Sequence, residues 1–247
     1  MRLLGDWLES NSRNSGSRIV LALDVDGPLE TRLERASSLV SSLKGRIAGV
    51  KLHWFLLLPF GALRLRELVE LCHDARLPMI VDFKMNDVGS TNLEVLDTLY
   101  SNGFDAVIAN PFVGYKEGME DVVNASHKLE KGVILLVYMS HEGAKEGYGL
   151  KVGGEPLYLR FARDTRRWGA DGAIVSAKSP AIIRQVRSIL RRDQVILSPG
   201  VGYQGGDPVK ALRAGSDYLI VGRSILKSKD PAGTLDALNK SLETKAA

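Results

Sequence analysis

Hydrophobic residues recur along the chain as short unbroken runs that alternate with longer amphipathic segments. Eight runs are rich in Val, Ile and Leu, and they occupy residues 18–24, 47–53, 78–84, 105–110, 132–139, 172–177, 194–200 and 217–222. Unbroken apolar runs are typical of strands that are buried on both faces of a parallel sheet. Amphipathic segments long enough for helices lie between them, for example at 61–75, 90–103 and 155–170. This alternation predicts parallel β-strand/α-helix units.

Eight such units favour a closed (β/α)8 barrel, the TIM-barrel fold of the α/β class, over an open doubly wound sheet. We therefore expect one barrel domain over residues 1–247. Residues 1–17 are predicted to form a short N-terminal extension, in which a polar linker follows a short helix. The apolar face of that helix would carry Leu3, Leu4, Trp7 and Leu8.

Composition narrows the class of protein. The chain is 45% hydrophobic and 25% charged, with a formal net charge of +4 that suits an anionic ligand. Lys and Arg are nowhere dense enough to indicate nucleic-acid binding. The most apolar run, 53–63, is too short for a membrane span and contains Pro59. Because Cys72 is the only cysteine and no signal peptide is evident, we expect a cytoplasmic protein with neither nucleic acid nor membrane as partner.

Polar residues occur where the predicted strands end, which is where (β/α)8 barrels place their active sites. The strand ends carry Asp24, Lys51 and His53, Asp82 and Lys84, Ser140, Ser198, and Gly222 with Arg223. Asp82 and Lys84 are two residues apart, so strand alternation predicts that they share one face. Buried ionised groups cost several kcal/mol each unless they are paired. One such residue alone is usually a solvated cap, but alternating carboxylates and ammonium groups at one end of a barrel indicate a site.

The segment "SPGVGYQGGDP" at 198–208 predicts a phosphate-binding loop. Its four glycines allow backbone N–H groups to approach an anion closely, although glycines alone are equally typical of a tight turn. Gln204 lies in the loop, and Arg223 ends the following strand, where a guanidinium can bind two phosphate oxygens. Loops after strands seven and eight of such barrels often form phosphate sites.

These segments together carry a family resemblance. The matching residues are "LALD" to Asp24, "VK" to Lys51, "DFKMND" from Asp82 to Asp87, Thr91, "MSHEGA" around Ser140, "SPGVGYQGGDP" around Gln204 and "VGRS" around Arg223. In this order the sequence resembles the orotidine 5'-phosphate decarboxylases in their short prokaryotic form, over nearly the whole barrel. Two departures are the pair Val88-Gly89, where the family often has Ile-Pro, and Tyr203, where it commonly has a small residue.

The resemblance implies decarboxylation of orotidine 5'-phosphate to uridine 5'-phosphate, the last step of de novo UMP biosynthesis, without metal or organic cofactor. It implies that Lys84 offsets the negative charge on the pyrimidine ring and donates the proton. Asp82 would face the substrate carboxylate, and Lys51 would complete the charge chain and, with Asp24, hold the ribose hydroxyls.

The remaining implied roles concern the base, the phosphate and the partner subunit. Ser140 would bind the pyrimidine, and the phosphate side of the site would be formed by Pro199, Gly202, Gln204, Gly222 and Arg223. In the family, the residues corresponding to Asp87 and Thr91 enter the neighbouring subunit's site. The resemblance therefore implies a homodimer with shared active sites.

Two other functions remain open at this point. A Mg2+-dependent ketogulonate-phosphate decarboxylase or hexulose-phosphate synthase shares the barrel and the Asp-x-Lys-x-x-Asp pattern, but Lys51 and the Gln-Gly-Gly loop favour the nucleotide enzyme. A non-catalytic nucleotide-phosphate binder would retain Gln204 and Arg223 without the charged array. The histidines show no metal-ligand spacing, so no metal site is predicted.

Overall fold

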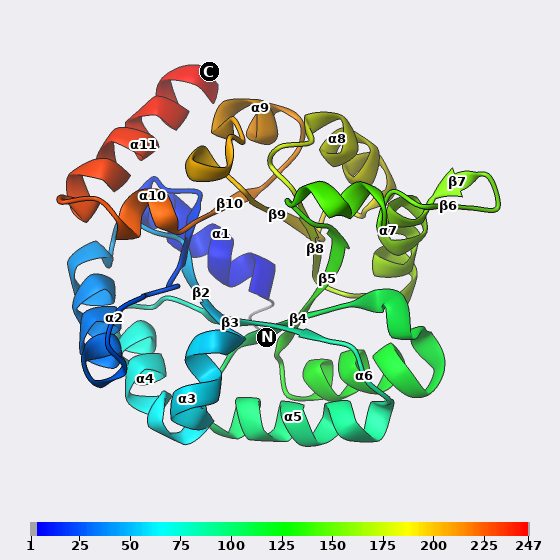
Figure 1. The fold of residues 1–247 in the computed structure, drawn as a ribbon, viewed down its shortest axis with the longest axis horizontal. Helices are drawn as coiled ribbons and strands as arrows, with labels where there is room; N and C mark the ends of the chain where they lie inside the picture. The colour runs from blue at the N-terminus through cyan, green and yellow to red at the C-terminus, as the bar shows by residue number, and fades with distance from the viewer. Residues whose placement is uncertain (1–3, 247) are drawn as a thin grey trace.

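The computed structural model describes residues 4–246, and its central feature is a closed barrel of eight parallel strands in the order β1-β10-β9-β8-β5-β4-β3-β2 (Figure 1). The barrel strands are β1 (Ile19–Ala22), β2 (Gly49–His53), β3 (Met79–Met85), β4 (Ala106–Ala109), β5 (Gly132–Tyr138), β8 (Gly172–Val175), β9 (Val195–Pro199) and β10 (Tyr218–Val221). Pairing of Ile19 with Leu219 closes the ring between β1 and β10. Every predicted strand is present, and the predicted fold is confirmed.

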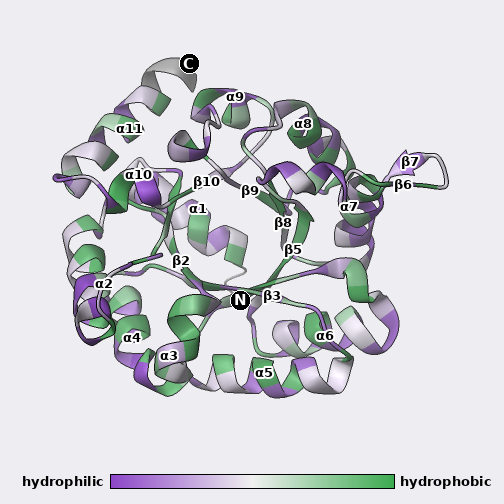
Figure 2. Cartoon of the chain, viewed as in Figure 1, coloured by the Kyte–Doolittle hydropathy of each residue, from purple (hydrophilic) through white to green (hydrophobic). Residues whose placement is uncertain are grey.

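Helices surround the barrel and turn their apolar faces toward it (Figure 2). They are α2 (Leu29–Leu43), α3 (Trp54–Arg64), α4 (Arg66–Asp74), α5 (Gly89–Ser101), α6 (Glu120–Lys128), α7 (Leu157–Trp168), α8 (Pro180–Ile189), α9 (Pro208–Arg213), α10 (Arg223–Leu226) and α11 (Pro231–Ala246). Short 3-10 turns span Pro111–Val113, Glu142–Lys145 and Gly202–Gln204, and a π-turn spans Tyr115–Met119. A small antiparallel hairpin, β6 (Lys151–Val152) and β7 (Glu155–Pro156), extends from the side of the barrel (Figure 1).

The apolar run at 53–63 forms most of α3, and the helix predicted from residue 61 begins only at Arg66. Gly61, with a φ of 68° and a ψ of 159°, kinks α3 itself, and Leu65, with a ψ of -6°, separates α3 from α4. Leu58 and Leu63 of α3 are 67% and 71% exposed. No helix in the described part of the chain has both the length and the apolar character needed to cross a membrane.

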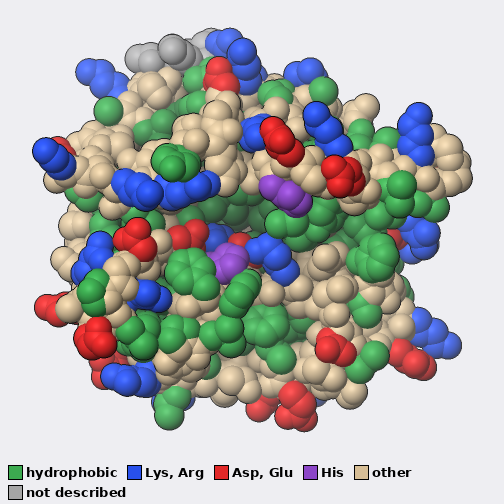
Figure 3. All heavy atoms as spheres, viewed as in Figure 1, with side chains coloured by type: hydrophobic (Ala, Val, Ile, Leu, Met, Phe, Trp, Pro, Cys, Tyr) green, Lys and Arg blue, Asp and Glu red, His purple; other side chains and the backbone are tan. Residues whose placement is uncertain are grey.

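Helix α1 (Leu4–Ser15) covers the N-terminal end of the barrel, where Leu4 and Leu8 join the apolar cluster inside the strands. Gly49 makes room for it, since a Cβ there would lie 2.9 Å from Leu8. The helix is longer than predicted and leaves little of the expected polar linker, while Leu3 lies outside the described residues. The opposite end of the barrel is hollowed, with charged and histidine side chains gathered around the hollow (Figure 3).

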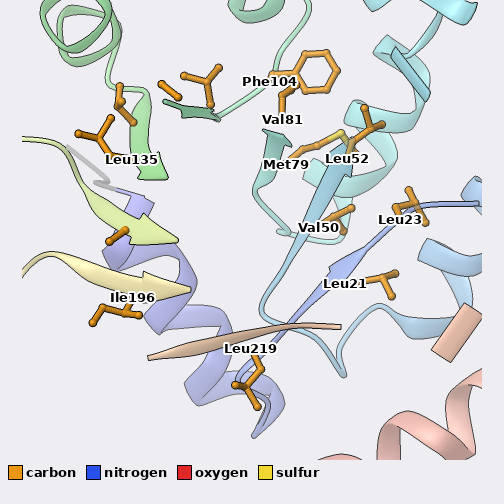
Figure 4. Close-up of a cluster of buried hydrophobic side chains, with 14 of the residues drawn as sticks. Leu21, Leu23, Val50, Leu52, Met79, Val81, Phe104, Leu135, Ile196 and Leu219 are labelled. Carbon is orange, nitrogen blue, oxygen red and sulfur yellow. The ribbon is translucent and has the colours of Figure 1, made fainter. Parts of the chain in front are cut away.

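Alternation along the strands creates two apolar layers. On β1, Val20 and Ala22 belong to the cluster inside the barrel, whereas Ile19 and Leu21 belong to the layer between strands and helices. Figure 4 shows part of this outer layer, including Leu21 and Leu52. Because both faces of each strand are covered, the strands are continuous apolar runs until the chain reaches the open end.

Candidate active site

The hollow at the C-terminal ends of the strands is a cavity of about 860 Å³, counting the open space at its mouth. Its floor is apolar and includes Ala22, Ile108, Leu136, Ile174 and Ile220. One side of its wall is charged and the other carries the glycine-rich loop. A concave apolar pocket with a few converging polar groups is the usual form of a small-molecule site.

Three strands bring their charged ends together on one wall. The Nζ atom of Lys51 lies 3.1 Å from Oδ2 of Asp82 and 3.4 Å from Oδ1 of Asp24. The Nζ atom of Lys84 lies 2.7 Å from Oδ1 of Asp82. The Lys51 side chain is only 5% exposed, and these two carboxylates are the counter-ions that offset the cost of burying it. The predicted pairing of alternating charges is therefore present.

Asp82 is the centre of this charged array, because each of its oxygens faces a different ammonium group. Burial by itself would raise the pKa of Asp82, but Lys51 and Lys84 outweigh it and hold the pKa below its ordinary value. Asp82 is consequently a carboxylate at neutral pH, and it keeps a negative charge at the wall of the cavity.

The end of β3 positions Lys84 by an irregular backbone. The register between β3 and β4 shifts between Val81 and Met85, and Lys84 has a φ of 56°. A left-handed conformation at a residue other than glycine costs on the order of 1–3 kcal/mol and must be maintained by its surroundings. Asp82 and Lys84 both line the cavity, as predicted, while Phe83 packs against the outer apolar layer. The strand reaches this arrangement through a bulge rather than regular alternation.

His53, which the sequence places at the end of its strand but to which no role was assigned, also lines the cavity. It lies two residues beyond Lys51 on β2, so strand alternation places both side chains on the same face. Its Nε2 atom is 3.3 Å from Nζ of Lys84, and its Nδ1 atom accepts a hydrogen bond of 3.3 Å from the amide of Phe55. A neutral imidazole has only one acceptor nitrogen. His53 can therefore accept a hydrogen bond from the Phe55 amide at Nδ1 or from the Lys84 amine at Nε2, but not from both at once.

The surroundings of His53 predict a measurable pH dependence of stability. Burial, followed by the charges of Lys51 and Lys84, lowers the pKa of His53 from its ordinary 6.5. As the pH falls below about 6.5, the unfolded chain takes up this proton before the folded chain does, so the folded state loses stability. His53→Asn retains an acceptor for the Phe55 amide at the start of α3. We expect the thermal midpoint of this variant to fall less between pH 7 and pH 5 than that of the wild type.

His127 must be considered in the same experiment, because a hydrogen bond to Asp171 raises its pKa and its effect on stability has the opposite sign. It is present in both proteins, so the difference between variant and wild type isolates His53. Equal falls in the two proteins would contradict a lowered pKa for His53.

The loop after β9 has the close approaches that only glycine permits. Gly200 has a φ of 94°, and a Cβ there would lie 3.0 Å from Oε1 of Gln204 and 3.1 Å from Cβ of Ser140. Gly202 has a φ of 66° and donates a backbone hydrogen bond of 3.1 Å to the carbonyl of Gly206. The loop is thus folded back on itself at the cavity wall, where Gln204 is exposed and lines the cavity.

The structure brings most of the predicted site residues to one cavity. Its lining includes Asp24, Lys51, Asp82, Lys84, Ser140, Pro199, Gln204, Gly222 and Arg223. Gly202 belongs to the glycine-rich loop without lining the cavity. The other two candidates, Asp87 and Thr91, are exposed and lie outside the cavity of their own chain.

The departure from the family pattern at Gly89 is explained by packing. Gly89 begins α5 and is buried against α6, where a Cβ would collide with the carboxylate of Asp121. The main-chain carbonyl of Asp87 accepts a hydrogen bond of 2.6 Å from the Asn92 side chain, and the carboxylate of Asp87 accepts one of 2.7 Å from the amide of Val88. These contacts hold the turn that presents Asp87 to solvent.

The fold and the cavity define a (β/α)8 barrel with a charged lysine–aspartate wall and a glycine-rich loop at the mouth of the cavity. The chain belongs to the orotidine 5'-phosphate decarboxylase / HUMPS family, whose family model matches residues 17–238.

Relatives and solved structures agree with this assignment. A Pyrococcus furiosus protein named orotidine 5'-phosphate decarboxylase is 36% identical over 213 residues, which are 86% of this chain and 92% of that protein. The crystal structure of the decarboxylase from Pyrococcus horikoshii has a TM-score of 0.76 at 33% identity, covering 91% of this chain and 99% of that one. The Methanocaldococcus jannaschii enzyme, complexed with the inhibitor BMP, has a TM-score of 0.79 at 26% identity and coverages of 92% and 98%.

Proposed function

We propose that this protein is an orotidine 5'-phosphate decarboxylase, which converts orotidine 5'-phosphate to uridine 5'-phosphate and CO2. The observation that carries the proposal is the array of Asp24, Lys51, Asp82 and Lys84 in a cavity that also holds the glycine-rich loop and Arg223. The family assignment and the names of the relatives support the same reaction.

The array supplies the chemistry that this reaction needs. Breaking the C–C bond releases CO2 and leaves an electron pair on the pyrimidine ring, where no adjacent group accepts it. Lys84 would offset this charge as it develops and then transfer its proton to the ring carbon. Asp82, held ionised by Lys51 and Lys84, would face the substrate carboxylate and orient Lys84. No cofactor takes part in this scheme. The required acceleration lies near the upper end of enzymatic values, above roughly 20 kcal/mol.

The rest of the cavity would bind the nucleotide. Asp24 and Lys51 would hold the ribose hydroxyls, and Ser140 would bind the pyrimidine above the apolar floor. The phosphodianion would lie at the loop after β9, against Gln204 and Arg223, with Pro199, Gly202 and Gly222 shaping the backbone there. Binding energy from the phosphate, which is remote from the reacting carbon, would contribute to lowering the barrier.

Substitution of Arg223 tests whether the nucleotide binds with its phosphate at the loop after β9. Arg223→Ala is expected to lower kcat/KM for orotidine 5'-phosphate. The lowering should correspond to about 1.5–3 kcal/mol of lost transition-state stabilisation, as for loss of a charge-assisted contact. The measurement is steady-state kinetics with orotidine 5'-phosphate and with orotidine, which lacks the phosphate. Equal losses on the two substrates would show that Arg223 does not contact the phosphate.

The proposed assembly is a homodimer that shares its active sites. Exposed apolar side chains occur on neighbouring elements, namely Trp54, Leu58 and Leu63 on α3, Val88 and Leu93 around the start of α5, and Phe112 after β4. Exposed apolar groups of this kind are typical of association surfaces. Asp87 and Thr91 lie in the same region, from which they would enter the partner's cavity. A cytoplasmic location is also part of the proposal and is supported by the single, buried Cys72.

A spectrophotometric assay on orotidine 5'-phosphate tests the reaction directly. We expect loss of substrate absorbance, formation of uridine 5'-phosphate, and unchanged activity after treatment with EDTA. Activity that disappears with EDTA and returns with Mg2+ would favour the metal-dependent sugar-phosphate enzymes instead. No turnover at all, with uridine 5'-phosphate still bound, would favour the non-catalytic binder.

A further inference from the structure

One aromatic ring contacts two cations, of which Arg223 lines the cavity and Lys227 is exposed outside its lining. The guanidinium carbon of Arg223 lies 4.2 Å from the ring centroid of Tyr203, and Nζ of Lys227 lies 5.4 Å from the same centroid. Arg223 and Lys227 are four residues apart, at the start of α10 and just after its end. Tyr203 is 60% exposed, so burial of the ring in a core does not account for its position.

Neither cation has an acidic partner among the side chains that the structure describes. Among the side chains that the structure describes, no carboxylate lies within ion-pair distance of Arg223 or Lys227. By contrast, Arg187 is paired with Asp217 at 3.2 Å. A ring face attracts a cation without cancelling its charge. The contact with Tyr203 therefore holds Arg223 in place and leaves its full charge available to an anion.

The backbone around Tyr203 fixes the ring relative to α10. The amide of Tyr203 donates a hydrogen bond of 3.3 Å to Oγ of Ser224, which follows Arg223 directly. Gly202 permits this approach, since a Cβ there would lie 2.7 Å from the same oxygen. Gly205, with a φ of 85°, ends the turn on the other side. The loop after β9 and the helix after β10 are thereby connected through both a hydrogen bond and a stacked ring.

We propose that Tyr203 is a positioning residue that holds Arg223 ready for the phosphodianion, and that Lys227 is a further cation of the phosphate subsite. The identity of the ligand as a nucleotide phosphate rests on the proposed function. A side chain that is already held in its bound geometry loses less conformational freedom on binding, which increases affinity. The tyrosine found where the family commonly has a small residue is thus assigned a role in phosphate affinity.

Calorimetric titration with uridine 5'-phosphate at fixed ionic strength tests the role of the ring. Tyr203→Ala is expected to weaken binding about three- to five-fold, the size of an exposed cation–π contact. Tyr203→Phe retains the ring and is expected to restore binding to within about two-fold of the wild type. Uridine, which lacks the phosphate, should bind the wild type and Tyr203→Ala equally. In kinetics, Tyr203→Ala should raise KM more than it lowers kcat.

A double-mutant cycle identifies the cations through which Tyr203 acts. In a background of Arg223→Ala and Lys227→Ala, adding Tyr203→Ala should have no further effect on uridine 5'-phosphate binding. Lys227→Ala alone should weaken binding, whereas Lys229→Ala, an exposed lysine two residues further on, is the matched control and should not. Additive effects, or equal losses in Tyr203→Ala and Tyr203→Phe, would overturn the positioning role.

The binding data separate this inference from the proposed reaction. If Tyr203→Ala weakens uridine 5'-phosphate binding but the wild type does not decarboxylate orotidine 5'-phosphate, the reaction is wrong and the phosphate role of Tyr203 stands. If the wild type is active and Tyr203→Ala binds uridine 5'-phosphate like the wild type, the positioning role is wrong and the reaction stands.

Discussion

Lys84→Ala is expected to reduce turnover of orotidine 5'-phosphate by roughly 10⁴- to 10⁶-fold, the combined size of losing a proton donor and a preorganised charge. The Nζ atom of Lys84 is 2.7 Å from Asp82 and lines the cavity, so its removal leaves no ammonium group on that side of the carboxylate. The measurement is single-turnover kinetics, because a slow chemical step is then separated from substrate binding.

Binding and folding controls show whether the loss is chemical. Uridine 5'-phosphate should bind Lys84→Ala with a much smaller loss than the loss in turnover, since Arg223 and Gln204 are unchanged. Lys128→Ala, which removes an exposed lysine from the end of α6, should retain wild-type turnover. Near-normal turnover by Lys84→Ala would rule out the proposed role of this residue.

Mixing two inactive variants is expected to restore activity if the sites are shared. Asp87→Ala and Lys84→Ala homodimers should each be inactive, because every site in them lacks one required group. In a heterodimer, one site carries both defects and the other combines an intact Lys84 with an intact Asp87 from the opposite chain. Random exchange of equal amounts gives about half heterodimer, so activity should return to about a quarter of the wild type, by the symmetry of a two-fold interface.

Asp87 is suited to this test because it is exposed and lies outside its own cavity, three residues beyond Lys84. Native mass spectrometry should establish that subunits have exchanged, and a mixture kept without exchange is the control. If heterodimers form and no activity returns, Asp87 acts within its own subunit and the shared site is wrong. If Asp87→Ala is active by itself, Asp87 is not required.

The barrel was predictable because its strands are covered on both faces. Continuous apolar runs such as 132–139 have no exposed face to accommodate polar residues, so polarity returns only at the open end. That contrast made Asp24, Lys51, Asp82 and Lys84 visible as site candidates. The boundaries of the helices were less predictable. Leu65 separates α3 from α4 where one helix from residue 61 was predicted, and the polar residues after Leu8 remain helical up to Ser15.

Contacts between segments that are distant along the chain were beyond sequence reasoning. His53 of β2 lies next to Lys84 of the neighbouring strand β3, and the ring of Tyr203 in the loop after β9 lies against Arg223 at the start of α10. Lys84 adopts a left-handed conformation that no local pattern indicates, because residues with a Cβ disfavour it unless tertiary contacts compensate.

For this protein, the sequence alone determined the order of the strands, the polar residues at their ends and the glycines of the loop after β9. These features depend on the burial of each residue and on local backbone freedom, and both are encoded by residue type. Only the tertiary structure decided that Asp82 lies between two ammonium groups with a lowered pKa, and that Leu4 and Leu8 close the far end of the barrel. Coulomb interactions and packing depend on distances of a few ångströms, and those distances are set only when the barrel closes.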